Sequence, residues 1–192
     1  MRIRQANNED FPQIEWLTRE AFWNHMGKGC DEHYIVHQTR KLPCYNRNLT
    51  FVAEVNDKIV GYIALYDAQL HHKDSTDDIL TICPVAVHPY KQNKGIGSGL
   101  IKHAFDKAKE LNYGAVIIFG DPNFYERFGF KNAMHFNITT EDGHNFDEFL
   151  ALELTDDYLK DKSGFFKELH EVELKKEDML DYEKQLLSQV PF

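Results

Sequence analysis

Apolar residues recur along the chain at spacings that alternate between those of helices and those of strands. A first helix is predicted with Asn8 or Asp10 as its cap and Pro12 near its start, and it should end before Gly27. A second helix should run from residue 31 to about residue 42, where Pro43 stops it. The polar run 69–78 is expected to form a hairpin loop. The remaining elements are predicted as strands over residues 49–55, 58–66, 79–88, 115–119 and 146–154, and as helices over residues 98–111, 121–129 and 173–187.

The order of these elements predicts the fold class. Asn56 and Asp57 form a tight polar turn between two β-rich runs, which indicates an antiparallel hairpin. The third strand, the helix after it and the next strand predict a right-handed parallel crossover, and Pro84 in the third strand predicts a bulge or the parting of two strands. A final antiparallel strand completes a single mixed α+β domain.

Length and charge exclude several classes of protein. The 192 residues are 42% hydrophobic and 28% charged, which excludes a disordered chain and fits one soluble domain. Residues 1–140 hold 16 basic and 16 acidic residues, whereas residues 141–192 hold 6 and 15, so the net charge of −9 belongs to the end of the chain. This distribution offers no basic stripe for nucleic acid. The apolar runs are strand-sized, so we expect no membrane partner and a cytoplasmic location.

The cysteines and histidines give no strong sign of a metal site. Three cysteines at irregular spacings match neither a zinc site nor a redox pair, so we expect reduced thiols. The best metal candidate is His71 and His72 followed by Asp74, but the two histidines are adjacent rather than four residues apart. We therefore expect no metal.

The segment that carries chemistry is a strand that runs through a glycine-rich turn into a helix, over residues 85–100. Its Gly95-x-Gly97-x-Gly99 pattern lets backbone amides approach a ligand, and the start of a helix favours an anion, here a pyrophosphate. The pattern lacks the last glycine of the dinucleotide fingerprint, and no Gly-Lys-Ser/Thr follows, which excludes two commoner phosphate loops. The alternative is a turn whose glycines serve only tight packing of helix on strand.

Two motifs together resemble the GCN5-related N-acetyltransferase (GNAT) superfamily. The first is Gln92-x-x-Gly95-x-Gly97, and the second is the aromatic-rich run 121–130, Asp-Pro-Asn-Phe-Tyr-Glu-Arg-Phe-Gly-Phe. Residues 120–130 and 149–154 further resemble the branch of predicted bacterial and archaeal acetyltransferases of the YhbS type. The resemblance implies a central, mostly antiparallel sheet with a splay, flanked by helices. It covers residues 1–155 and leaves residues 156–192 as an acidic extension, packed on the same domain or trailing it.

The resemblance also implies roles for individual residues. Tyr125 matches the tyrosine that protonates the departing CoA thiolate, and its alternative role is a core aromatic that stacks on Phe124 and Phe128. Many relatives carry a glutamate on the strand that corresponds to residues 81–85, and this chain has none. Cys83 is expected to be a small buried residue rather than a nucleophile. The residues implied to bind acyl-CoA are Val85, Ala86, Val87, Gln92, Asn93, Lys94, Gly95, Ile96, Gly97, Ser98, Gly99 and Asn123. The residues that could supply a base instead of the missing glutamate are Glu32, His33 and Glu148.

The function that follows from the resemblance is acetyl transfer from acetyl-CoA to a primary amine of a small molecule, peptide or protein, by direct attack. One alternative is an acyl-CoA sensor without catalysis, and another is a nucleotide-binding protein that uses the glycine loop. The acceptor should enter between the first helices and the late strands, near Trp23, Asn24, Met26, Tyr34 and the loop 140–146. The protein is expected to be a monomer or a homodimer.

Overall fold

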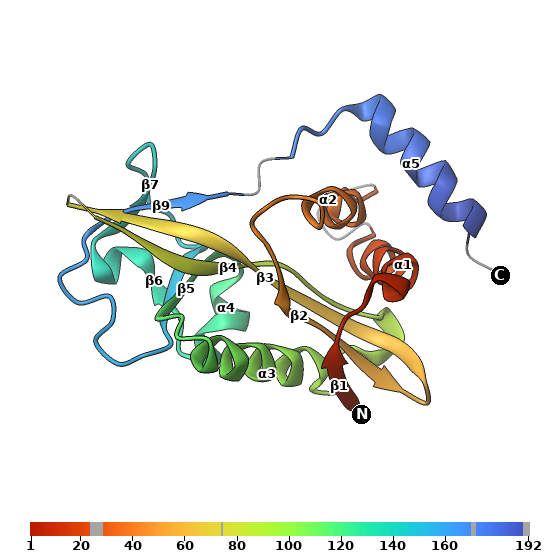
Figure 1. Cartoon of the computed structure of the whole chain (residues 1–192), viewed down its shortest axis with the longest axis horizontal. Helices are drawn as coiled ribbons and strands as arrows, with labels where there is room; N and C mark the ends of the chain where they lie inside the picture. The colour runs from red at the N-terminus through yellow and green to blue at the C-terminus, as the bar shows by residue number, and fades with distance from the viewer. Residues whose placement is uncertain (24–28, 74, 170–171, 190–192) are drawn as a thin grey trace. The chain divides into compact units, whose positions relative to one another are not determined.

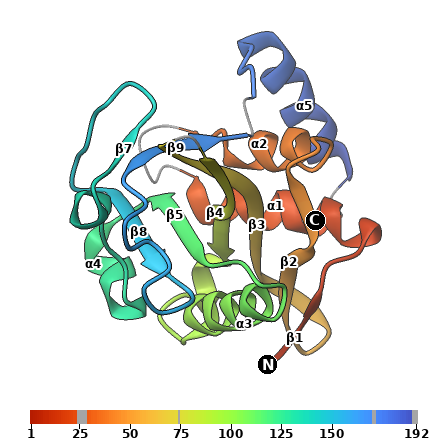
Figure 2. The same ribbon diagram turned by 60° about the vertical axis from the view of Figure 1, so that its left-hand side comes forward.

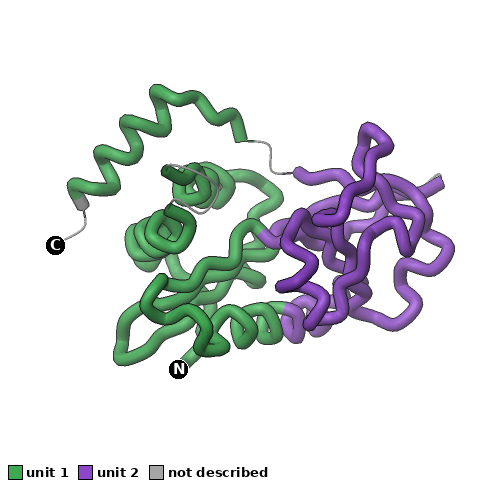
Figure 3. The backbone as a smooth tube through the Cα atoms, turned by 180° about the vertical axis from the view of Figure 1, so that it is seen from behind, with its two compact units in different colours: residues 1–65, 83–104, 170–192 green, residues 66–82, 105–169 purple. Residues whose placement is uncertain are grey.

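The structure is a computed structural model that describes residues 1–23, 29–73, 75–169 and 172–189. Unit 1 consists of residues 1–65, 83–104 and 170–192, and unit 2 consists of residues 66–82 and 105–169 (Figure 3). Two strands and one helix pass through both units: β3 (Lys58–His72), β4 (Ser75–Val87) and α3 (Ile96–Glu110).

Unit 1 combines four neighbouring strands with helices (Figure 1). In this part of the sheet β1 (Arg2–Gln5) pairs in antiparallel fashion with β2 (Tyr45–Val55), and β3 and β4 follow in order. Asn56 and Asp57, with φ of 51° and 59°, join β2 to β3, which confirms the predicted hairpin. The helices that lie wholly within unit 1 are α1 (Phe11–Phe22), α2 (Glu32–Thr39) and α5 (Lys176–Gln189), with single 3₁₀ turns at Asn8–Asp10 and Pro89–Lys91.

Unit 2 holds the later strands around a core that includes Leu70, Ile117, Phe149 and Phe166. Here β5 (Ala115–Phe119) and β6 (Lys131–Asn132) both pair antiparallel with β8 (Phe149–Glu153), as Figure 2 shows for β5 and β8. β9 (Gly164–Glu168) pairs antiparallel with β3, and β7 (Ile138–Thr140) pairs parallel with β9. The helical turns are α4 (Pro122–Tyr125) and two 3₁₀ segments, Glu126–Phe128 and Ala133–Phe136.

The predicted fold class is confirmed. The chain is a mixed α/β protein with a mostly antiparallel open sheet, and β4, α3 and β5 form the expected crossover, with β4 and β5 parallel at Leu80 and Val116. Pro84 lies within β4, as the sequence indicated. Over the described residues, β4 and β5 share this single register pair, as expected of strands that part.

The prediction of a loop over residues 69–78 is wrong. β3 continues to His72 and β4 begins at Ser75, so most of the polar run is paired strand. Its polar side chains have partners in unit 2, because the His71 ring stacks on Phe165 at 4.7 Å and the Asp77 carboxylate lies 2.6 Å from Nζ of Lys162. The second helix is also shorter than predicted, since α2 ends at Thr39.

Candidate active site

The glycine loop of unit 1 leads from the end of β4 into α3. Asn93 and Gly95 have φ of 58° and 78°, in the left-handed region that favours glycine, and α3 begins immediately afterwards at Ile96. The first bond of the helix is donated by the amide of Gly99 to the carbonyl of Gly95, at 2.9 Å. The amides at residues 96–98 therefore lie at the helix start, where they have no acceptor within the helix and can bind an anion.

The space around the glycines distinguishes ligand approach from helix packing. A Cβ at Gly95 would meet no heavy atom within 4 Å, and one at Gly97 would lie at an ordinary 3.5 Å from Val87. By contrast, a Cβ at Gly61 of β3 would lie 2.9 Å from side-chain atoms of both Ile96 and Leu100. Gly61 is thus a glycine that allows α3 to pack on the sheet, and Gly95 and Gly97 are not needed for that packing, whereas a Cβ at Gly99 would lie 3.1 Å from Cε of Met1.

Side chains of the loop hold its backbone in place. The Nε2 amide of Gln92 donates to the carbonyl of Val87 at 3.1 Å, and Nζ of Lys94 donates to the carbonyl of Tyr90 at 3.2 Å. In β4 the side chain of Ala86 is buried, whereas Val85 and Val87 are partly exposed. The predicted acyl-CoA residues from Val85 to Gly99 therefore lie together in unit 1, on one continuous segment.

Tyr125 belongs to unit 2 and ends the short helix α4. Asp121 caps this helix, because its Oδ1 accepts from both the backbone amide and the Nδ2 group of Asn123, each at 3.0 Å. The Tyr125 ring lies 5.0 Å from the Phe124 ring and 5.4 Å from the Phe130 ring, both edge-on. The Phe128 ring, the second predicted partner, lies 6.4 Å away, so the aromatic packing suggested as an alternative role is present and also fixes the position of the phenol.

Gly120 makes room for Tyr125 and was not identified from the sequence. A Cβ at Gly120 would lie 2.5 Å from Cε2 of Tyr125, so the ring lies directly over this glycine. Burial raises the pKa of the Tyr125 phenol to about 12, which keeps it protonated at neutral pH. The phenol can therefore donate a proton but cannot act as a base.

The three residues considered as possible bases occupy different surroundings. Glu148 is exposed, and Glu32 accepts a hydrogen bond from the backbone amide of Asp31 at the start of α2. His33 is buried, and its Nε2 lies 2.8 Å from Oε2 of Glu183. Burial lowers the pKa of His33, so the ring is neutral, but it is engaged in contacts between helices.

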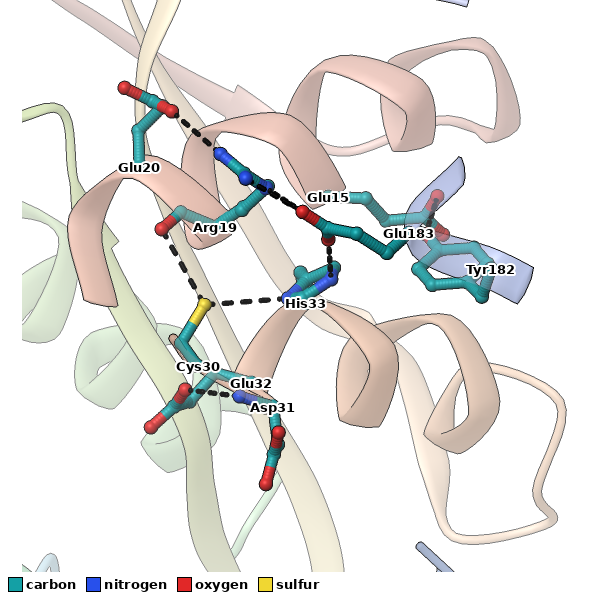
Figure 4. Close-up of polar contacts among 9 residues, drawn as sticks. All are labelled: Glu15, Arg19, Glu20, Cys30, Asp31, Glu32, His33, Tyr182 and Glu183. Atoms are coloured by element: carbon teal, nitrogen blue, oxygen red, sulfur yellow. Dashed lines mark hydrogen bonds and ion pairs between the residues drawn. The ribbon is translucent and has the colours of Figure 1, made fainter. Parts of the chain in front are cut away.

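His33 belongs to a group of polar residues that joins α1, α2 and α5, which we call the helical cluster: Glu15, Arg19, His33, Tyr182 and Glu183 (Figure 4). The Tyr182 hydroxyl donates to Oε2 of Glu15 at 2.6 Å, and Arg19 donates to Oε1 of Glu183 at 2.6 Å. The acidic helix α5 thus packs on the other two helices through polar contacts that are buried or partly buried.

The residues expected near the acceptor are only partly available. Tyr34 is buried in a small core with Tyr182 and Leu186, so α5 covers it. Trp23 is 42% exposed, and the Arg19 guanidinium lies 4.0 Å from the centre of its ring. Asn24 and Met26 lie outside the described residues.

The three cysteines form no disulfide with one another, as expected of reduced thiols. Cys44 is buried, whereas Cys30 and Cys83 are partly exposed, so the expectation that Cys83 is buried is wrong. Sγ of Cys30 lies 3.4 Å from Nδ1 of His33, and burial, followed by nearby Glu32, raises the pKa of its thiol to about 12. Cys30 is therefore a protonated thiol.

The described part of the chain contains neither a cluster of metal ligands nor a helix able to span a membrane. His72 lies 3.4 Å from Asp77, Asp74 lies outside the described residues, and no group of three or more metal-ligating side chains occurs elsewhere in the described ranges. Among the same residues, no helix has both the length and the apolar character that a membrane span requires.

Residues 2–133 match the family model described as "Acetyltransferase (GNAT) domain". Over 171 residues the chain is 28% identical to the "uncharacterized N-acetyltransferase YhbS" of Escherichia coli strain K12, which covers 89% of this chain and 97% of that relative. The crystal structure of the E. coli GNAT family N-acetyltransferase YhbS in complex with CoA aligns with a TM-score of 0.77 and 26% identity, over 88% of this chain and 90% of the other. A GNAT family acetyltransferase from Brucella melitensis, solved with acetyl-CoA, shares the fold, with a TM-score of 0.68, 24% identity and coverage of 87% and 94%.

Proposed function

Since the chain belongs to the GNAT acetyltransferase family, we propose that it moves an acetyl group from acetyl-CoA to a primary amine of a small molecule, peptide or protein. The observation that carries this proposal is the glycine loop, whose open space at Gly95 and free helix-start amides suit a pyrophosphate. The similar YhbS structure contains CoA, which supports the same ligand here.

The proposed acyl-CoA site uses backbone groups more than side chains. Backbone groups of Val85 and Val87 would pair with the pantetheine amides as an added strand does. The amides of residues 92–97 would hold the pyrophosphate, and those of Ser98 and Gly99 would extend this contact. Asn123 would be a further contact, although its side chain is already bonded to Asp121.

The proposed chemistry is direct attack without a covalent enzyme intermediate. A neutral amine attacks the thioester carbonyl carbon, and a backbone N–H near Val85 stabilises the oxyanion. Tyr125 then donates its proton to the CoA sulfur. Because an ordinary thiol has a pKa of about 8.5, the transfer from a phenol of pKa about 12 requires that the buried site also disfavour the thiolate.

We further propose that residues 1–155 form the acyltransferase domain and that residues 156–192 are an extension of it. Two elements of this extension support the proposal. β9 pairs with β3, and α5 packs on α1. The extension would then be an integrated part of the folded protein.

Binding measurements test the ligand first. In calorimetry, acetyl-CoA and CoA should bind markedly more tightly than ATP or ADP, because only the first two carry pantetheine. Equal affinity for ATP and acetyl-CoA would contradict the acyltransferase proposal and favour the nucleotide-binding alternative.

A screen of amines with acetyl-CoA, followed by release of free thiol, tests the reaction. Thiol release that depends on an added amine would establish the enzyme and reveal the class of acceptor. Tight binding of acetyl-CoA with no thiol release from any amine would instead favour the acyl-CoA sensor.

A further inference from the structure

Cys30 lies beside the helical cluster and contacts one of its members (Figure 4). Sγ of Cys30 lies 3.4 Å from Nδ1 of His33, and Nε2 of the same ring lies 2.8 Å from Oε2 of Glu183. The other oxygen of this carboxylate, Oε1, accepts a hydrogen bond from Arg19 at 2.6 Å. A thiol, an imidazole and a carboxylate held by a guanidinium therefore follow one another, all within unit 1.

The tautomer of the His33 ring follows from these contacts. A carboxylate that binds a guanidinium is ionised, and it can only accept hydrogen bonds. Nε2 of His33 and Oε2 of Glu183 are both buried, and among the described residues neither atom has another hydrogen-bond partner. Because burial keeps the ring neutral, its one proton lies on Nε2, and Nδ1 presents a lone pair to the sulfur of Cys30.

The thiol proton of Cys30 has two acceptors within reach. The carbonyl oxygen of Arg19 lies 3.6 Å from Sγ, but it already accepts the backbone amide of Trp23 at 2.9 Å. Nδ1 of His33 is nearer to Sγ, at 3.4 Å, and it needs a donor because this residue is only 4% exposed. The thiol therefore donates to Nδ1, which is the arrangement of a nucleophile beside its base.

The His33 ring is held in this orientation by α5. Its ring stacks on the Tyr182 ring at 5.7 Å, and the Tyr182 hydroxyl is in turn bonded to Glu15. A base that a third group orients is the arrangement that activates hydroxyl and thiol nucleophiles in proteins. His33 can thus accept the thiol proton, and Glu183 acts as a positioning residue.

Cys30 combines this base with access to solvent. It is partly exposed, whereas Cys44 is buried. Burial and then the Glu32 carboxylate raise the pKa of the Cys30 thiol to about 12, so the sulfur keeps its proton at rest, as the serine hydroxyl of a hydrolase does. Such a sulfur becomes nucleophilic only when a base takes its proton, and the thiolate of a high-pKa thiol is intrinsically the stronger nucleophile.

The charges around Cys30 discriminate between reagents. Exposed Asp31 and partly exposed Glu32 follow it directly in the chain, and both carboxylates act on the thiol. The nearby cation, Arg19, is already paired with Glu183 and Glu20. A neutral or cationic reagent should therefore approach the sulfur more readily than an anionic one.

We propose that Cys30 is a site of covalent modification, at which a small neutral or cationic disulfide forms a mixed disulfide with the protein and His33 acts as the base. This site goes beyond the proposed acetyl transfer and does not depend on it.

The exchange balances without a further reactant. The sulfur of Cys30 passes its proton to Nδ1 of His33 and attacks one sulfur of the small disulfide. A new S–S bond forms, the old S–S bond breaks, and its electron pair leaves on the second sulfur, which takes the proton from His33. The products are the mixed disulfide at Cys30 and one small thiol.

Wild-type protein contains its own reference, because Cys83 is also partly exposed. Full-length protein is treated with cystamine at neutral pH, and the mixed disulfide at each cysteine is quantified over time by peptide mass spectrometry. Cys30 should react at least about tenfold faster than Cys83, since only Cys30 is proposed to have a base. Equal rates at the two cysteines, or a faster reaction at Cys83, would overturn the proposal.

A second reagent tests the class of disulfide. Anionic dithiodiglycolate should react more slowly than cystamine, and this preference should be larger at Cys30 than at Cys83. An equal preference at the two cysteines would overturn the assignment of the reagent class.

Substitutions distinguish a base from a packing residue. If His33 is the base, His33→Asn should slow the modification of Cys30 about tenfold or more. If His33 only packs the helices, the same change should expose the thiol and accelerate the reaction, which would overturn the proposal. His37→Asn is the matched control, because His37 lies one turn later on α2 and contacts Tyr182 and Glu15, and it should not slow the reaction.

The tautomer is tested without any reaction. In ¹⁵N NMR of histidine-labelled protein, the ring signals that are absent from His33→Asn should show the proton on Nε2, and a proton on Nδ1 would overturn the proposal. Glu183→Gln can still accept from Arg19, but its amide can donate to Nε2 and move the ring proton to Nδ1. This variant should therefore slow the modification of Cys30 and leave the rate at Cys83 unchanged. An undiminished rate at Cys30 in a variant whose proton has moved to Nδ1 would contradict the role of His33 as the base.

Discussion

Tyr125 and Tyr182 are tyrosines whose phenols differ in what holds their protons. The Tyr182 hydroxyl is buried in the helical cluster, where burial and then the hydrogen bond to Glu15 both raise its pKa. The pKa of Tyr125 is raised to about 12 by burial, with no contribution from a charged partner. The proton of Tyr182 is thus part of a structural hydrogen bond, whereas that of Tyr125 is held only by the cost of forming a buried phenolate.

This difference between the two phenols assigns Tyr182 to the stability of the fold and Tyr125 to the proposed chemistry. A phenol that already donates 2.6 Å to a buried carboxylate cannot give up its proton without leaving that carboxylate unsatisfied. A phenol placed by ring contacts over Gly120 can donate to a ligand at little structural cost. The same substitution at the two positions should therefore damage different properties.

The largest expected effect is on turnover in Tyr125→Phe. The ring and its packing remain, so the unfolding midpoint and the affinity for acetyl-CoA should change little, while kcat should fall about 10²- to 10⁴-fold. Steady-state kinetics and thermal unfolding of the same preparation provide the comparison. A stable variant with unchanged kcat would transfer the acid role to water and remove the contrast with Tyr182.

The next effect concerns stability in Glu168→Gln as a function of pH. The folded pKa of about 7 lies above the ordinary 4.5, so ionisation penalises the folded state increasingly as the pH rises from about 4.5 to 7. Glutamine cannot ionise, so the variant should be more stable than wild type by up to about 3 kcal/mol at pH 8 and no more stable below pH 4. Denaturant unfolding at the two pH values checks the sign, and a variant less stable at pH 8 would show that Glu168 is ionised and well paired.

Tyr182→Phe should show the opposite profile to Tyr125→Phe. Among the described residues, removal of the hydroxyl leaves buried Glu15 with His37 at 3.0 Å and Arg40 at 3.4 Å, both on Oε1, so the free energy of unfolding should fall by about 2 kcal/mol. Below the unfolding transition, kcat should remain within a few-fold of wild type. Denaturant unfolding and acetyl transfer at 20 °C check this, and a large loss of kcat in the folded variant would implicate the helical cluster in catalysis.

The smallest effect on stability is expected for Gly95→Ala, which tests the loop rather than either tyrosine. The backbone φ of 78° costs a residue with a side chain about 1 kcal/mol, although the Cβ itself meets no protein atom. Binding of CoA should weaken more than stability does, because the methyl group would enter the space of the pyrophosphate. Gly143→Ala, also with positive φ and open surroundings, is the matched control and should lose stability without loss of CoA affinity.

Sequence patterns predicted the elements that depend on local chemistry. The Asn56-Asp57 turn, the helix after the glycine loop and the short helix capped by Asp121 all occur, because each is specified by residues close together in the chain. The same holds for the resemblance of the two motifs to acetyltransferases, which the family match confirms.

The sequence patterns did not predict features that depend on contacts between residues far apart in the chain. The polar residues around His71 do not alternate as a strand should, and their pairing depends on Phe165, about ninety residues later. Strand β9 is only five residues long and gave no separate pattern, so neither it nor the position of Glu168 was foreseen. The burial of Tyr182 and Leu186 was likewise invisible in a helix rich in charge.

The hydrogen bond between Glu15 and Tyr182 joins residues 167 positions apart, and this separation has a consequence for synthesis. Ribosomes add about 5 to 20 residues per second, so roughly ten to thirty seconds pass between the two residues. During that time His37 and Arg40 can already contact Oε1 of Glu15, but Oε2 lacks its final donor and water must solvate it. The first helices of the nascent chain therefore cannot reach their final packing until α5 has emerged.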